Sequence, residues 1–80
     1  MNDSEILHQI DQLVKEEHAL MQKSEHNDLS VEEHTRMKAL EVALDQCWDL
    51  LRQRRARRHA GLDPEGAAVR DETVVEHYQQ

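Results

Sequence analysis

The apolar residues of this chain recur at alternating steps of three and four, the spacing that places side chains along one side of an α-helix. In the second half, this stripe consists of Met37, Leu40, Leu44, Cys47 and Leu51. The pattern predicts a helix over residues 30–60. Ser30 followed by Glu33 fits a capping box at its start, and Gly61 can close its end in the left-handed conformation.

A second stripe of the same kind precedes it and predicts a helix over residues 3–26. Asn2 and Glu5 have the spacing of a capping box at its start. The stripe consists of Ile6, Leu7, Ile10, Leu13, Val14, Leu20 and Met21. Because only a few residues around Asn27 connect the two helices, we expect an all-α chain whose residues 1–60 form an antiparallel two-helix hairpin.

Folding the chain at this turn predicts which residues of the two helices meet. Ile10 is expected near Cys47 and Leu13 near Leu44, while Asp3 and Glu5 approach Arg52. On this register the second helix extends beyond the first. The overhang carries five arginines, which are Arg52, Arg54, Arg55, Arg57 and Arg58.

Residues 61–80 form an acidic C-terminal tail. Asp63 followed by Pro64 is a typical helix start, because proline is favoured at the first helical position. We therefore expect a short helix over residues 64–69 within this tail.

Eighty residues make one domain at most, and two helices bury little apolar surface by themselves. Pairing two hairpins into a four-helix bundle would bury the second side of each stripe, including Leu7, Leu50 and Trp48. We therefore predict a homodimer. The expected core and dimer interface consists of Leu40, Leu44, Cys47, Trp48 and Leu51.

The composition favours a cytoplasmic protein. The acidic start of the chain lacks the apolar run of a secretory signal, and no stretch has the length of a membrane span. The single cysteine, Cys47, lies on the helical stripe and is expected to be a buried small hydrophobe in a reducing compartment.

Metal binding or pH sensing is an alternative hypothesis. Helical bundles bind metals through inward carboxylates and histidines, and the two charged positions in the stripes each stand beside a histidine. The candidates are Glu17, His18, Glu33 and His34. A polar layer that sets the helix register explains the same residues, so we expect no metal and no other cofactor.

The five arginines of residues 52–58 suggest either nucleic-acid binding or docking of a protein segment. The net charge of −7 and the absence of interleaved aromatic residues disfavour nucleic acid. The acidic tail, or an acidic partner protein, is the favoured occupant. Enzyme chemistry is not expected, because the sequence contains neither a phosphate-binding glycine loop nor a nucleophile motif.

Several segments together resemble a known family of short bacterial proteins, domain of unknown function 2630. The segments are residues 40–56, including Leu-Asp-Gln-Cys-Trp-Asp-Leu-Leu-Arg-Gln-Arg, with Leu13 to His18, Gly61 to Pro64 and Val74 to Tyr78. The resemblance implies a small helical protein found mainly in actinobacteria, without an assigned substrate, cofactor or catalytic residue. The favoured function is a non-enzymatic, homo-oligomeric protein–protein interaction module.

Overall fold

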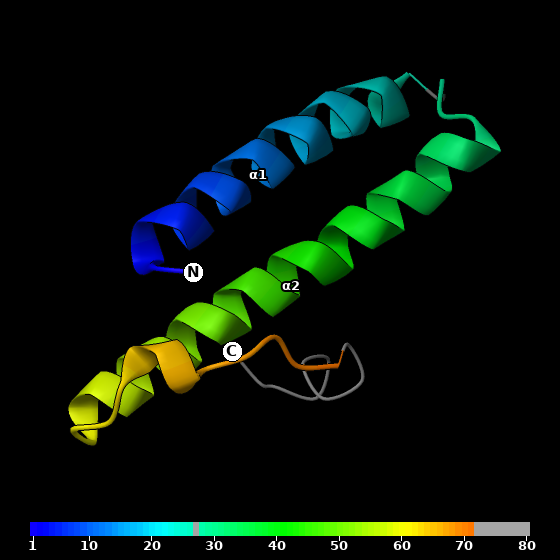
Figure 1. Ribbon diagram of the computed structural model, residues 1–80. Coiled ribbons are helices and arrows are strands. Elements are labelled where there is room, and N and C mark those ends of the chain that lie inside the picture. The colour runs from blue at the N-terminus through cyan, green and yellow to red at the C-terminus, as the bar shows by residue number, and fades with distance from the viewer. Residues whose placement is uncertain (27, 72–80) are drawn as a thin grey trace.

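The computed structural model describes residues 1–26 and 28–71, which contain two long helices and one short turn of 3-10 helix. Helix α1 spans Asp3–Glu25 and helix α2 spans Val31–His59. The two run antiparallel beside each other, and the chain then turns back along α2 (Figure 1). The described residues contain no strand, which confirms the prediction of an all-α chain with two packed helices.

Both predicted capping boxes are confirmed. The Asn2 side chain accepts a hydrogen bond from the Glu5 amide, and the Glu5 carboxylate accepts one from the Asn2 amide. Ser30 and Glu33 exchange the same pair of bonds at the start of α2. Each box pairs backbone amides that a helix start leaves without a partner, so both helix starts are fixed by local sequence.

The end of α2 is closed by Gly61, as predicted. Gly61 has a φ of 75°, in the left-handed region that favours glycine. Its amide donates to the Arg58 carbonyl at 3.1 Å, and the Leu62 amide donates to the Arg57 carbonyl at 2.8 Å. These two bonds satisfy carbonyls at the helix end and reverse the chain direction.

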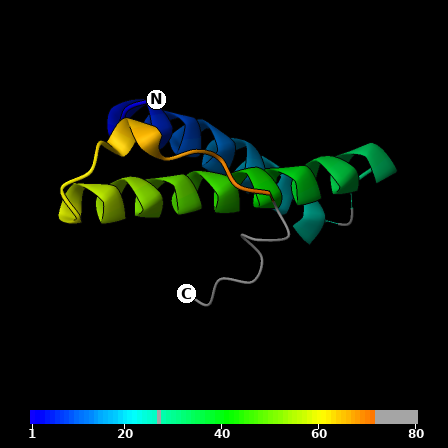
Figure 2. The ribbon, with the colours of Figure 1, turned by 60° about the horizontal axis from the view of Figure 1, so that its bottom comes forward.

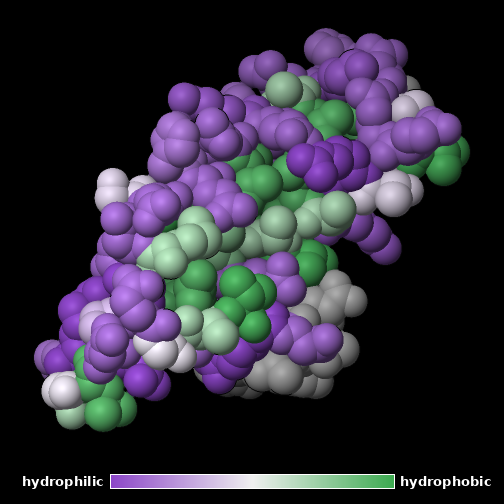
Figure 3. All heavy atoms as spheres, in the orientation of Figure 1, coloured by the Kyte–Doolittle hydropathy of each residue, from purple (hydrophilic) through white to green (hydrophobic). Residues whose placement is uncertain are grey.

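The core lies between α1 and α2, where the two apolar stripes meet. Ile6 and Leu40 are fully buried, at 0% exposure each. Figure 3 shows hydrophobic side chains gathered in a band between the helices and beside the returning tail, with hydrophilic side chains around it. The other buried hydrophobic residues are Ile10, Leu20, Leu44 and Leu50.

One predicted detail of packing is wrong. Leu50 does not need a second hairpin for its burial: it is buried within the chain, in a core cluster against which Ala67 of the returning tail packs. Asp3 forms ion pairs with Arg54 and Arg58, and it lines one hollow together with Arg52, which it was predicted to approach. The end of α2 extends beyond the start of α1 (Figure 1), as predicted, and Arg54 and Arg58 reach back to pair with Asp3.

The predicted tail helix over residues 64–69 is a single 3-10 turn, η1, which spans Pro64–Gly66. Asp63 caps it as expected, with its side chain accepting from the Glu65 amide. Ala67 returns to an extended conformation, with φ −72° and ψ 145°. The segment then runs along α2 (Figure 2). Glu72 and Glu76 of the acidic tail lie outside the described residues.

Candidate interaction surface

The hairpin has two long sides, and the returning tail covers one of them. Its main anchor is Asp49, which is 0% exposed. Arg70 donates to both carboxylate oxygens of Asp49, at 2.6 Å from Nη2 and 3.0 Å from Nε. Such a two-pronged pair fixes both distance and orientation. We call the side of α2 that carries Asp49 the strapped side.

The electrostatics of Asp49 follow from these contacts. Burial by itself raises the pKa of this carboxyl group, but hydrogen bonds from Arg70 and Gln53 together outweigh burial, so the pKa lies below its usual value. Asp49 is therefore an ionised, fully paired carboxylate inside the protein.

Two glutamines of α2 bind the backbone of the tail. Gln53 Nε2 donates both to Asp49, at 2.8 Å, and to the Ala68 carbonyl, at 2.7 Å. Gln46 Nε2 donates to the Arg70 carbonyl at 3.3 Å. The tail therefore lies on a row of polar side chains of α2. These side chains form hydrogen bonds with backbone groups that an extended segment cannot pair by itself.

Arg54 joins three parts of the chain and is the most buried arginine. Its Nε donates to Asp3 in α1 at 2.5 Å, and its Nη1 donates to Glu65 at 3.2 Å and to the Pro64 carbonyl at 3.3 Å. The amino terminus of Met1 lies 3.5 Å from Glu65 as well. Figure 2 shows the start of α1 and η1 close together at this end of the hairpin.

The remaining arginines of the segment differ in their surroundings. Arg57 donates to the Asp63 carbonyl at 2.5 Å, and Arg58 binds both oxygens of Asp3, at 2.8 and 3.2 Å. Arg52 and Arg55 are exposed on the surface of α2. The chain's own carboxylates and carbonyls thus engage Arg54, Arg57 and Arg58.

Four ion-paired carboxyl groups predict an acid-sensitive fold. The pKa of Asp3 is lowered by Arg58 and Arg54, that of Glu16 by Arg36, and that of Glu33 mainly by Lys23. Asp49 is the fourth. Because the folded pKa lies below the unfolded value, the stabilisation is present above about pH 4 and is lost as the pH falls through the folded pKa.

We therefore expect the urea midpoint of unfolding to fall between about pH 5 and about pH 3. Urea titrations followed by far-UV circular dichroism at several pH values measure this. The Asp49→Asn variant should show a shallower fall, because it lacks one of the four titrating groups. A midpoint that stays constant down to pH 3 contradicts the expectation.

The opposite side of the hairpin carries half-exposed apolar residues, and we call it the open side. On α1, Leu7, Val14 and Met21 follow one another at steps of seven and are 49%, 44% and 50% exposed. Steps of seven keep residues on one side of a helix. The described part of the tail does not reach this row, because its contacts with α2 lie elsewhere: Gln53 is roughly 140° around the helix from Trp48.

Trp48 is the centre of the open side, and 44% of it is exposed. It lines two neighbouring hollows. One, of about 300 Å³, has a net positive charge, because Arg52, Arg55 and Arg58 line it together with a single carboxylate, Asp3, and with Leu7. The other, of about 430 Å³, is acidic and includes Glu17, Glu41 and Asp45. The flat apolar ring thus separates a positive region from a negative one.

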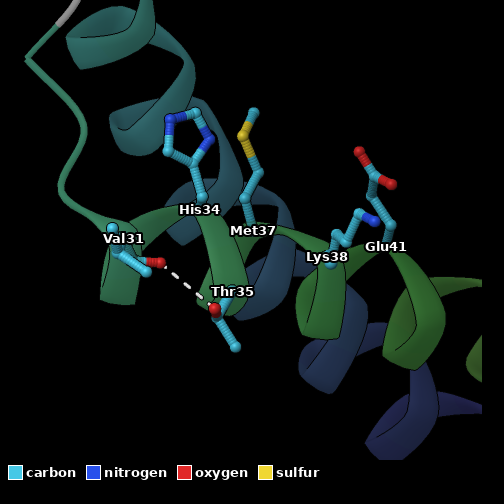
Figure 4. Close-up of a pocket in the computed structure, with 6 residues that line it drawn as sticks. All are labelled: Val31, His34, Thr35, Met37, Lys38 and Glu41. Atoms are coloured by element: carbon cyan, nitrogen blue, oxygen red, sulfur yellow. Dashed lines mark hydrogen bonds between the residues drawn. The ribbon is translucent and has the colours of Figure 1, made fainter.

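A further shallow hollow of about 420 Å³ lies over the first turns of α2. His34, Met37 and Glu41 project to the same side of the helix, and the Thr35 hydroxyl donates to the Val31 carbonyl at 3.1 Å (Figure 4). The hollow is a groove beside the Glu41 end of the open side. The side chains that line it differ in chemistry, and their charged groups do not point toward a common centre.

The candidate metal or pH-sensing residues are distributed over separate environments. Glu33 is occupied by Ser30 and by Lys23, whose Nζ lies at 2.6 Å. His18 contacts Gln22, His34 lines the hollow of Figure 4, and Glu17 lines the acidic hollow. Within residues 1–26 and 28–71, no group of three His, Cys, Asp or Glu side chains is arranged to hold a metal ion.

Cys47, from the predicted interface, is half-buried beside the core cluster. Burial raises the pKa of its thiol, so less of it is in the nucleophilic thiolate form. Leu40 and Leu44 are buried in the hairpin, and Leu51 is half-buried against the same cluster. Of the residues predicted for core or interface, Trp48 is therefore the most exposed.

The polar anchors of the tail, namely Asp49, Gln53 and Arg70, were not predicted from the sequence. One signal for them was present: Arg70 is the only arginine or lysine between positions 61 and 80. A single positive charge within an acidic segment is a candidate for a specific partner. Its partner could not be chosen, because several carboxylates of α2 lie within reach of a tail of this length.

Within the described residues, neither helix has the length and apolar character needed to cross a membrane.

These features define a class of protein: a small antiparallel helical hairpin whose tail is fastened along one side by a buried ion pair, with a half-apolar side that the described part of the tail leaves open. The chain belongs to the family described as "Protein of unknown function (DUF2630)", which matches residues 2–80. This confirms the resemblance noted in the sequence.

Relatives of similar length occur in mycobacteria. The chain is 51% identical over 77 residues to "Uncharacterized protein Rv0898c" of Mycobacterium tuberculosis, covering 95% of this chain and 88% of the relative. The same values hold for "Uncharacterized protein Mb0922c" of Mycobacterium bovis. No solved structure matches the chain.

Proposed function

We propose that this protein is a non-enzymatic protein–protein interaction module of the cytoplasm that forms homodimers through the open side of its hairpin. The observation that carries the proposal is the row of half-exposed apolar residues on α1 together with Trp48 on α2. Large apolar residues collected on one side of a monomer are typical of an interaction site. Partly exposed tryptophan is a frequent anchor of such interfaces.

The arrangement of the tail supports the choice of side. On the strapped side, the tail already pairs the polar groups of α2 and covers Leu50. On the open side, Leu7 and Trp48 line a hollow between the two helices that a second hairpin can fill. Two hairpins joined there would form the four-helix bundle that the sequence predicts.

Sedimentation and light scattering test the proposal directly. At micromolar concentration, we expect a mass of twice the 9.4 kDa chain. Because Trp48 is the only tryptophan, its fluorescence should shift to shorter wavelength as the protein is concentrated, when the ring leaves water. A mass of one chain at all concentrations would contradict the proposal.

Two variants locate the surface. Trp48→Ala should shift the equilibrium to monomer, because truncation of a buried interface anchor commonly costs about 2 kcal/mol or more, or roughly thirtyfold in affinity. The matched control is Leu62→Ala, which truncates a side chain of similar exposure in the turn after α2. Equal weakening by both variants would mean that the open side is not the interface.

A further inference from the structure

The open side of α2 carries a charge pattern that is symmetric about Trp48. Glu41, Trp48 and Arg55 follow one another at steps of seven, and all three are exposed. The acid therefore lies about 10 Å along the helix on one side of the ring, and the base lies about 10 Å on the other. Asp45 and Arg52 repeat the arrangement closer to the ring, three residues before it and four after it.

The two hollows beside Trp48 show that these charges belong to distinct regions. Glu41 and Asp45 line the acidic hollow together with Glu17 from α1. Arg52 and Arg55 line the basic hollow together with Leu7 from α1. Trp48 belongs to both, so the surface is divided into an acidic half and a basic half by one apolar ring.

A surface with this pattern is complementary to a copy of itself turned by 180°. Resting on the self-association proposed above, we infer that two hairpins meet with their α2 helices antiparallel and with Trp48 at the twofold axis. Glu41 of each copy then faces Arg55 of the other copy. A parallel arrangement would place Glu41 opposite Glu41 and Arg55 opposite Arg55, which is repulsive at both ends.

The same geometry gives Trp48 its role. At the axis, the two rings meet in the centre of the interface, where contacts are most completely removed from water. Leu7 lies beside the ring in the basic hollow and adds apolar surface from α1. The charged pairs at both ends determine the direction of the helices, whereas the apolar centre supplies most of the affinity.

Charge reversal tests the antiparallel pairing. Glu41→Arg alone and Arg55→Glu alone each place like charges together at both ends of a homodimer. Each should weaken dimerisation about tenfold or more, since two attractive pairs become repulsive. An equimolar mixture of the two variants should form a heterodimer, because both pairs are attractive again. The double variant should regain a homodimer close to wild-type affinity.

Analytical ultracentrifugation measures these dimer dissociation constants, and far-UV circular dichroism verifies that each variant is helical. The control is Lys15→Glu, a charge reversal on the exposed outer surface of α1, which should leave the dissociation constant within about twofold. Should a reversal variant lose its helical structure, Glu41→Gln and Arg55→Gln replace it. Each neutral variant should weaken the dimer, and the mixture of the two should not regain wild-type affinity.

The outcomes separate the two proposals. A wild-type chain that remains monomeric overturns both the proposed function and this inference. A wild-type dimer whose affinity is unchanged by either reversal, or whose two variants fail to associate when mixed, overturns only the antiparallel arrangement. Reversals that leave each homodimer unchanged, while the mixed variants associate more tightly than the wild type, would instead indicate that like positions face each other.

Discussion

Replacing Leu40 with alanine is expected to lower the free energy of unfolding by about 2–5 kcal/mol. Leu40 is 0% exposed in the middle of α2, so the substitution removes buried apolar surface and leaves a cavity. Small domains are stabilised by only about 5–15 kcal/mol in total, so a loss of this size removes much of the folded population. Urea unfolding followed by circular dichroism, at one protein concentration, measures the change.

Val31→Ala is the matched control, because it also truncates an aliphatic residue in α2, at a position that is 79% exposed. We expect it to change the free energy of unfolding by less than about 0.5 kcal/mol. Should Leu40→Ala cost no more than this control, the contact between α1 and α2 described above would not be the core of the protein.

Replacing Asp49 with alanine is expected to lower the free energy of unfolding by about 2 kcal/mol. The substitution leaves the Arg70 guanidinium and the Gln53 amide without the carboxylate that pairs both of them. It should also release the tail, so trypsin should cleave after Arg70 faster than in the wild-type protein. Chemical unfolding and the rate of this cleavage are independent measurements of the two effects.

A double-mutant cycle with Arg70→Ala isolates the pair. If Asp49 and Arg70 act on each other, the double variant should be less destabilised than the sum of the two single variants, because no charge is then left without its partner. Asp11→Ala is the control: Asp11 forms an exposed pair with Lys15 within α1, and such pairs contribute only about 0.3–0.5 kcal/mol. Additive effects of Asp49→Ala and Arg70→Ala would contradict the coupling.

The helices were predictable because the information for them is local. Their starts depend on capping residues three positions apart, such as Ser30 and Glu33, and both boxes are present in the structure. The end of α2 depends on a single glycine, Gly61. The apolar stripes repeat every three or four residues and were therefore sufficient to predict that two helices pack against each other.

The tail and the arginine contacts were less predictable because they depend on residues far apart in sequence. Asp49 and Arg70 are 21 residues apart, and Asp3 and Arg54 are 51 apart. Each charge had several possible partners of opposite sign, and the choice among them depends on the exact rotation of α2. The predicted register brought Asp3 to the arginine segment, but it did not identify Arg54 and Arg58 as the ion-pair partners of Asp3.

The open side illustrates a different limit of prediction from the sequence. The spacing of Glu41, Trp48 and Arg55 is visible in the sequence, but so are many other pairs of charges at helical spacing. Only the exposure of Trp48, together with the position of the tail on Asp49 and Gln53, separates these three residues from the rest of the helix surface. These three residues form a candidate interface because the described part of the tail leaves them exposed.

The ion pair of Asp49 and Arg70 has a consequence for biosynthesis. A ribosome adds about 5–20 residues a second, so the 21 positions between these residues correspond to a delay of about 1–4 s. During this interval the Asp49 carboxylate still lacks its Arg70 partner. The contact between the tail and α2 therefore cannot be completed before Arg70 has been synthesised.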